Sequence, residues 1–482
     1  MALDWKTLLC DTRIREAEGG RGSTPLEDDG RTHFDRDYDR AVFSAPVRRL
    51  KDKTQVFPLE PNDAVRTRLT HSMEVSTLAR GLARGAARWM LREHHLESVQ
   101  QVLDIEAIAA TCGLIHDLGN PPFGHAGEEA ISSWFKKNFG EAGQALYPGT
   151  ERLPARVGQL RNDFLMFEGN AQTLRIVSRL QLLADSYGLN LTVGTLSAAM
   201  KYTAASDATS EGGSADTKKP GYFASEQNKV DLIRSLTGTG SARNPIAYLV
   251  EACDDMVYAT VDIEDGVKKG IVSWRAVEAF LEQHDDSGMA KSVLKTVHEY
   301  IEKADTPLEG RARDEALAQH FRTVVIGESK KEILAAFQRN YARLMQGEAL
   351  EQGDLISASG ASRLIEVCKR FGRERVYSAP ETLRLETLGR RVIHGLMDIF
   401  WEGARECPVP VDTTGKAWKK FNKSPEGKVY NLLSRNYRTA FEAACKSSSL
   451  PPLYHRYQLV TDYVCGMTDT FACDLHAQLT HG

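Results

Sequence analysis

Apolar residues recur at helical spacing along most of the chain, while the alternating patterns typical of strands are sparse. The stretch 71–90 carries one apolar stripe, formed by Val75, Leu78, Leu82, Ala86 and Trp89. The stretch 105–116 is apolar nearly all round, which predicts a buried helix, and the Gly-Asn-Pro-Pro sequence at 119–122 ends it. This pattern predicts an all-α fold.

The same periodicity predicts further helices at 171–185, 246–262, 275–283, 290–303, 330–346, 361–371, 383–402, 428–446 and 457–478. Segments rich in Gly, Ser, Pro or charge interrupt the pattern at 204–221, 403–427 and 447–452. The first of these segments is expected to form a mobile surface loop. The charged, glycine-containing stretch at 11–40 predicts an N-terminal arm, residues 1–40, that is only partly ordered.

Composition excludes several classes of protein. The 482 residues carry 61 Lys and Arg against 65 Asp and Glu, a net charge of −4, which argues against a globally basic nucleic-acid binder. No run approaches the roughly 18 apolar residues of a membrane span, and the N-terminus lacks the apolar centre of a secretory signal. Eight cysteines without a CxxC pair indicate scattered thiols. We expect a cytoplasmic protein with no membrane partner.

The most informative stretch is 113–129, GLIHDLGNPPFGHAGEE. His116 and Asp117 are adjacent at the end of the apolar helix, where the backbone turns away and both side chains can reach one metal ion. An isolated His-Asp pair is most often a surface pair or a helix cap. Other residues must therefore support a metal site.

Two distant residues supply that support. His71 faces the core on its helix, where the alternative is an ordinary core histidine. Asp254 lies in the helix predicted at 246–262, and a buried carboxylate is costly unless it is paired or bound to a metal. Together with His116 and Asp117 they form a mixed nitrogen and oxygen set, which suits Mn²⁺, Fe²⁺, Co²⁺, Ni²⁺ or Zn²⁺ and leaves positions open for solvent or substrate.

This H…HD…D arrangement resembles the signature of the HD-domain metal-dependent phosphohydrolases. Within that superfamily, the chain resembles the bacterial dGTPase branch of the deoxynucleoside-triphosphate triphosphohydrolases. The blocks that carry the resemblance include RTRLTHSMEV (66–75), HDLGNPPFGHAGEEA (116–130), FEGNAQTLRI (167–176), EACDDMVYATVDIEDG (251–266) and LVTDYVCGMTDTFACDLHAQL (459–479). The resemblance implies an HD-domain helical core at 41–280 and a helical C-terminal region at 281–482, packed on the core, that completes the substrate site and makes oligomer contacts.

The resemblance also implies an activity. The family hydrolyses a dNTP to the deoxynucleoside and inorganic triphosphate by attack of water at the α-phosphorus, and we expect dGTP to be the favoured substrate of this chain. A divalent ion, Mn²⁺ or Mg²⁺ first and Fe²⁺, Co²⁺, Ni²⁺ or Zn²⁺ as alternatives, would activate the water and neutralise developing charge. The implied partners are the dNTP, a nucleotide effector or single-stranded DNA, and further copies of the chain, for which a hexamer is one form.

His125 and Glu128 are spaced i, i+3 at the start of the next helix, so their side chains share a face. The resemblance implies that His125 transfers a proton and that Glu128 orients it. Helix capping is the alternative for His125, and Glu129 points to a different face. Where some relatives have a second catalytic histidine this chain has Asn170, so the relay rests on the pair alone or is completed by water.

Further residues are candidates for substrate contacts. Tyr258 and Asp262 follow Asp254 at four-residue intervals, and by resemblance they contact the 3′-hydroxyl, with the Tyr258 ring filling the place of a ribose 2′-hydroxyl. Arg68 precedes His71 by one helical turn and can meet the triphosphate. By resemblance, Gln55 contacts the sugar, and Lys201, next to Tyr202, also contacts the substrate.

Two other functions remain open. One is an HD-domain phosphohydrolase that acts on another substrate, such as a nucleoside monophosphate, a cyclic nucleotide or guanosine tetraphosphate. The other is a nucleotide- or single-stranded-DNA-binding regulator with a vestigial hydrolase site. The intact set of four metal ligands argues against the second.

Overall fold

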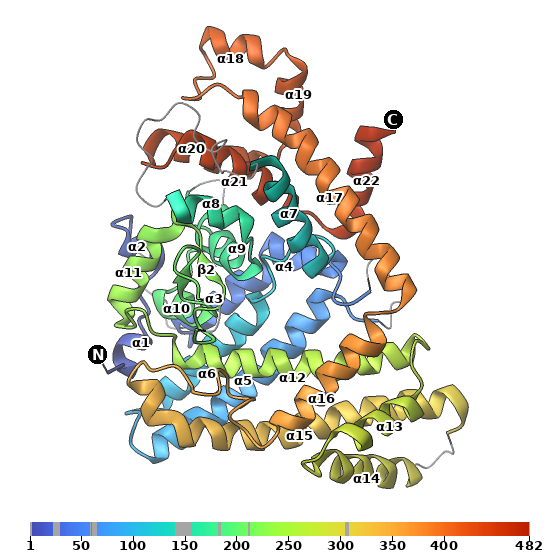
Figure 1. Cartoon of the computed structure of the whole chain (residues 1–482). Helices are drawn as coiled ribbons and strands as arrows, with labels where there is room; N and C mark the ends of the chain where they lie inside the picture. The colour runs from blue at the N-terminus through green and yellow to red at the C-terminus, as the bar shows by residue number, and fades with distance from the viewer. Residues whose placement is uncertain are drawn as a thin grey trace.

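The computed structural model describes residues 2–22, 29–57, 59, 65–139, 157–181, 185–210, 213–303 and 308–481 (Figure 1). Regular structure in these residues is almost entirely helical. The described sheet consists of two short parallel strands, β1 (Ala204–Ala205) and β2 (Pro220–Tyr222). The predicted all-α fold is therefore confirmed.

One layer of helices, at the bottom of Figure 1, surrounds the first hydrophobic cluster. It consists of α5 (Arg68–Arg92), α6 (Val99–Ile115), α12 (Pro245–Lys268), α13 (Trp274–His284), α14 (Met289–Glu302), α15 (Gly310–Met345) and α16 (Ser362–Phe371). Local sequence sets the helix starts, because the Ser98 side chain caps α6 and Asn244 caps α12 ahead of Pro245.

The α5–α6 contact depends on Gly113. A Cβ atom at this position would lie 2.7 Å from the Ser76 Cα atom, so only glycine lets the two backbones approach so closely. The Ser76 hydroxyl donates to the Ala110 carbonyl at 2.7 Å and ties the helices at the same level. This close approach brings the first turn of α5 next to the last turn of α6.

A second hydrophobic cluster lies among the helices in the upper part of Figure 1. These helices are α7 (Gly124–Phe139), α8 (Val157–Leu165), α9 (Gly169–Arg175), α10 (Val193–Ala199), α11 (Gln227–Thr237), α17 (Pro380–Glu406), α18 (Lys416–Phe421), α19 (Pro425–Leu432), α20 (Arg435–Ser447), α21 (Pro452–Cys465) and α22 (Asp469–Thr480). The other elements are α1 (Trp5–Leu8), α2 (Ile14–Ala17), α3 (His33–Val42), α4 (Ala45–Arg49), η1 (Leu50–Asp52), η3 (Ile176–Leu180), η4 (Ala224–Glu226) and η5 (Gly372–Val376). The last helix of the chain, α22, lies alongside α17.

Several expected elements differ from the observed ones. The helix expected at 330–346 is the second half of α15, and α18 lies inside the expected break at 403–427. The helix expected at 428–446 is divided into α19 and α20. The helix expected at 457–478 is divided into α21 and α22, because the Thr468 side chain accepts from the Phe471 N–H and starts a new helix.

Two segments that were expected to be mobile or partly ordered are packed where the structure describes them. The segment 204–221 was expected to be a mobile surface loop, but its Asp216 is buried and accepts hydrogen bonds from Arg243 and Tyr248. At the N-terminus, Trp5 is buried and its indole N–H donates to the Tyr341 hydroxyl at 2.9 Å. No described helix is both long enough and apolar enough to cross a membrane.

Candidate metal centre and active site

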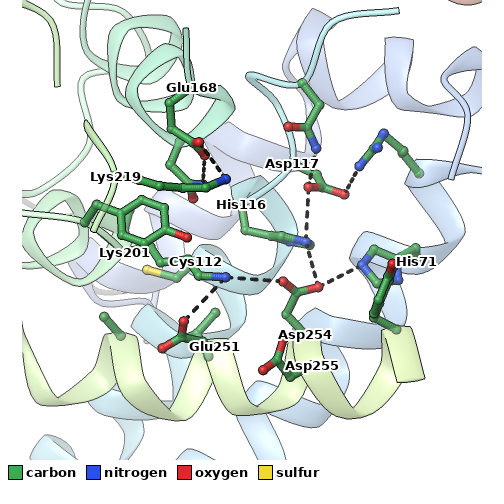
Figure 2. A pocket seen from close by; sticks show the side chains of 18 of the residues that line it. His71, Cys112, His116, Asp117, Glu168, Lys201, Lys219, Glu251, Asp254 and Asp255 are labelled. Carbon is green, nitrogen blue, oxygen red and sulfur yellow. Dashed lines mark hydrogen bonds and ion pairs between the residues drawn. The ribbon is translucent and has the colours of Figure 1, made fainter. Parts of the chain in front are cut away.

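The four predicted metal ligands lie together where α5, α6 and α12 meet (Figure 2). Ligand atoms of His71, His116 and Asp117 all lie within 4.8 Å of one another. The Asp254 Oδ1 atom is 3.1 Å from His71 Nε2 and 3.4 Å from His116 Nε2. The structure therefore brings together two imidazoles and two carboxylates, of which the outermost pair, His71 and Asp254, lies 183 residues apart in the sequence.

The orientation of His116 suits a metal ligand. Its Nδ1–H donates to the Gly113 carbonyl at 2.8 Å, which leaves the Nε2 lone pair directed at Asp117 and Asp254. This Nε2 atom is buried and has no hydrogen-bond partner among the described residues. A buried nitrogen without a partner is costly, and a divalent cation would satisfy it. The donor set therefore fits a metal ion.

Electrostatics keep the carboxylates ionised. Burial by itself would raise the pKa of Asp117, but Arg68, whose Nη1 lies 2.5 Å from Oδ2, and His116 hold that pKa well below its usual range. The pKa of Asp254 is likewise lowered against the effect of burial, mainly by His116. Burial also disfavours a charged His116, yet Asp117 and Asp254 raise its pKa to about 9, so Nε2 binds either a proton or, in its place, a metal ion. Such a site attracts positive charge.

The metal ligands open into a cavity of about 300 Å³, which is large enough for a small-molecule ligand. Three cationic side chains, Arg68, Lys201 and Lys219, line it. The other polar or charged lining residues include Gln55, Asn120, His125, Glu128, Glu168, Asn170, Tyr202, Glu251, Asp255 and Tyr258. The cavity therefore combines a metal site with three cationic side chains that can contact an anionic ligand.

His125 and Glu128 form a hydrogen-bonded pair at the edge of this cavity. The His125 Nδ1 atom lies 2.9 Å from Glu128 Oε2, and the other carboxylate oxygen accepts from the Gly169 N–H at 2.9 Å. The hydrogen bond to Glu128 raises the pKa of His125. The Glu128 side chain is mostly buried whereas that of His125 is 76% exposed, so the imidazole is held from one side and accessible from the other.

The turn before α7 positions this histidine. Phe123 and Gly124 both have positive φ, 63° and 57°, and a Cβ atom on Gly124 would lie 2.7 Å from the Arg68 Nη2 atom. The positive φ favours glycine at 124, and a side chain there would also displace the Arg68 guanidinium group. The turn allows α7 to start immediately beside Arg68, with His125 in its first turn.

The predicted substrate residues do not all reach the cavity. Gln55, Lys201 and Tyr258 line it, as does Arg68. Asp262 is buried two turns beyond Asp254 on α12, and its carboxylate accepts a hydrogen bond from the Tyr377 hydroxyl. Burial raises the pKa of Asp262 well above its usual value. Asp262 is therefore not among the described residues that line the cavity.

Other cavity residues were not identified from the sequence. Lys219 Nζ pairs with Glu168 Oε2 at 2.9 Å, and Asp255 pairs with Lys369 at 2.7 Å. Nothing in the sequence singles out Lys219, because it belongs to the segment 204–221, whose composition indicates a surface loop. Glu168 had a usable signal, since it lies inside the FEGNAQ block directly before Asn170. Asn170 itself lines the cavity and donates to Glu168 at 2.7 Å.

Comparison with known proteins relates the chain to named enzymes. A model of the HD domain family matches residues 68–153. The chain is 35% identical over 488 residues to the "deoxyguanosinetriphosphate triphosphohydrolase-like protein" of Listeria monocytogenes, with 99% of each chain covered, and equally similar to that of Listeria innocua. It is 32% identical to the deoxyguanosinetriphosphate triphosphohydrolase of Yersinia pestis, with 92% of this chain and 93% of the relative covered.

Proposed function

The chain belongs to the HD-domain family of deoxyguanosinetriphosphate triphosphohydrolases, and we propose that it hydrolyses dNTPs to the deoxynucleoside and inorganic triphosphate. One observation carries this proposal: a cation-binding set, a histidine–carboxylate pair and three cationic side chains line a single cavity. Hydrolysis of a triphosphate ester needs a metal ion at the reacting phosphorus, a group that transfers a proton, and positive charge that binds the phosphates. We propose dGTP as the preferred substrate, in keeping with the names of the relatives.

An HD domain binds a divalent metal ion, and the His71, His116 and Asp117 cluster with Asp254 would hold it here. When bound, the ion supplies Lewis acidity at an α-phosphate oxygen and lowers the pKa of a water molecule. We propose Mn²⁺ over Mg²⁺, because two imidazole donors suit Mn²⁺ better than the oxygen-preferring Mg²⁺.

His125 moves the proton in the proposed reaction. Since a carboxylate oxygen can only accept, the hydrogen bond to Glu128 places a proton on Nδ1 and leaves Nε2 to exchange a proton with the substrate or a water molecule. Glu128 is in turn held by the Gly169 N–H, so the imidazole has a defined tautomer and orientation. Asn170 offers no titratable group, and the proposed relay therefore uses this pair alone.

The remaining residues divide into two groups by chemistry. Arg68, Lys201 and Lys219 supply positive charge for the triphosphate. Gln55 and Tyr258 supply a polar side chain and a ring for the deoxyribose. In this proposal Asp262 contacts the sugar only after the Tyr377 hydroxyl, which now donates to it, moves away.

Product analysis tests the proposal. The metal-reconstituted protein is incubated with each of the four dNTPs, singly and in mixtures, and the products are separated by ion-exchange chromatography. We expect deoxynucleoside and inorganic triphosphate in equal amounts. Release of pyrophosphate or monophosphate would instead indicate another phosphohydrolase, and binding without turnover would indicate a nucleotide-binding regulator. Stimulation of one dNTP's hydrolysis by another would identify a nucleotide effector.

We further propose a cytoplasmic homo-oligomer, with a hexamer as the expected form, that binds single-stranded DNA. Light scattering coupled to size-exclusion chromatography measures the number of subunits. Affinity for a single-stranded oligonucleotide at two salt concentrations tests DNA binding, since phosphate contacts weaken steeply as salt rises. The absence of any affinity at low salt would refute that part of the proposal.

A further inference from the structure

Asp469, in the first turn of α22, connects two loops of the active site. Its carboxylate is buried, and Oδ2 accepts from the Thr54 N–H at 3.0 Å and from the Thr54 hydroxyl. Oδ1 accepts from the Phe123 N–H at 3.0 Å. Gln55 directly follows Thr54, and His125 comes two residues after Phe123. One carboxylate therefore holds the backbone next to both a substrate residue and the proton-transfer residue.

The loop held by Oδ1 is in a conformation that needs support. Phe123 has a φ of 63°, a left-handed conformation that a bulky side chain adopts only when its surroundings enforce it. The hydrogen bond from Asp469 fixes its N–H, and its ring packs on Gly389 of α17, where a Cβ atom would lie 2.5 Å from the ring. Without the carboxylate, the Phe123 N–H would lose its only described hydrogen-bond partner.

A second connection runs parallel to the first. The buried Lys53 ammonium group donates to the Asn120 carbonyl at 2.5 Å and to the Cys465 carbonyl at the end of α21 at 2.8 Å. The Cys465 thiol in turn contacts the Gly119 carbonyl at 2.9 Å. The loop from Asp117 to Gly124 is therefore attached to the α21–α22 pair at two levels.

Capping of α22 does not explain why a buried carboxylate stands at position 469. The Thr468 side chain accepts from the Phe471 N–H and performs that role, whereas the Asp469 carboxylate points away from its own helix. Nor is Lys53 its ion-pair partner in the described contacts, since the ammonium group donates to two carbonyls instead. The Asp469 carboxylate is buried and hydrogen-bonded to neutral donors of the two loops, so its burial is compensated by contacts to the active-site loops.

We propose that Asp469 is a positioning residue for the reaction, through which the C-terminal helices set the placement of His125 and Gln55. This inference rests on the proposed function, because its effect is read in dNTP hydrolysis. Asp469 does not touch the substrate cavity itself. It acts through the turn at Phe123 on one side and through Thr54 on the other.

The test is Asp469→Asn, which keeps the shape of the side chain. An amide has one oxygen, and it will turn that oxygen to the two donors of Thr54, so that its NH₂ group faces the Phe123 N–H and the bond to this turn is lost. We expect kcat for dGTP to fall about tenfold to a hundredfold through misplacement of His125, with KM nearly unchanged because Gln55 stays in place. The content of bound Mn²⁺ should equal that of the unaltered protein.

Asp163→Asn is the matched control. Asp163 is also buried and accepts three hydrogen bonds from neutral donors, Ser206, Ala224 and Tyr454, none of which lines the cavity as described. Both variants should lower Tm, but only Asp469→Asn should lower kcat when assayed well below either Tm. Equal kcat values for the two variants would overturn the inference.

Two further cases need their own readout: a variant that does not fold, and a protein that lacks the proposed activity. If Asp469→Asn does not fold, Thr54→Val tests the other side of the connection, where loss of the hydroxyl should raise KM roughly threefold without changing kcat; an unchanged KM overturns the inference. An unaltered protein that releases no triphosphate overturns the proposed function and this inference with it. An active protein whose Asp469→Asn variant keeps its kcat overturns the inference alone.

Discussion

Replacing Glu128 by Gln isolates the role of the histidine–carboxylate pair. The exchange keeps the size of the side chain and removes its charge, while one of its two contacts, to His125 at 2.9 Å or to the Gly169 N–H at 2.9 Å, must be lost or reversed. A hydrogen bond to a charged group contributes about 1.5–3 kcal/mol. Because the His125 side chain is 76% exposed, water weakens the interaction, and we take the lower end. At about 1.4 kcal/mol per factor of ten, kcat should fall roughly tenfold.

The assay is steady-state release of triphosphate from dGTP across a range of pH. Glu128 raises the pKa of His125, so the variant should shift the limb of the pH profile that reports His125 toward lower pH. The neighbouring Glu129→Gln is the control, since Glu129 is exposed on the same helix. An unchanged kcat and pH profile in Glu128→Gln, or an equal loss in Glu129→Gln, would refute the assignment of the pair.

Other predictions address the metal and the substrate. His116→Ala combined with Asp117→Ala should abolish turnover and bound Mn²⁺ while the helical circular-dichroism signal remains; retained activity contradicts the metal assignment. Arg68→Gln should raise KM for dGTP about tenfold, as loss of a charge-assisted contact predicts, and an unaltered KM would argue against phosphate binding there. Tyr258→Ala should lower the ratio of kcat/KM for dGTP to kcat/KM for GTP about tenfold. Competition assays in which this ratio is unchanged would disprove the role of Tyr258. EDTA should lower Tm, and Mn²⁺ should restore it, because a ligand of the folded state stabilises by mass action; a Tm indifferent to both would exclude a structural contribution of the metal.

Helix positions follow from the sequence where a local signal is strong. The stripe in 71–90 and the apolar run in 105–116 correspond to α5 and α6 within a few residues. The first half of α15 lies outside the predicted helices, although its buried residues Leu317, Phe321 and Val325 recur at helical spacing. The division between α21 and α22 depends on one capping residue, Thr468, inside a continuous helical pattern.

The site residues also fall into those that local sequence features indicate and those that depend on contacts with distant parts of the chain. His71 and Asp254 could be selected from the sequence because each is a costly polar residue within a helix, and His116 and Asp117 because they are adjacent at the end of the apolar helix α6. Asp262 follows the same four-residue interval as Tyr258, yet the structure buries it against Tyr377, which comes from a different part of the chain. Periodicity specifies the face of a helix but not the neighbour that covers that face.

The helical class, the ligand types and the histidine–carboxylate pair follow from local sequence patterns, because helical periodicity and i, i+3 spacing are local properties. The packing of the whole chain places Lys219, from an apparent loop, in the cavity, where it pairs with Glu168. It also decided that Asp469 holds Thr54, 415 residues away in the chain. Such contacts depend on how buried donors and acceptors are satisfied after the helices pack, and no local pattern encodes that packing.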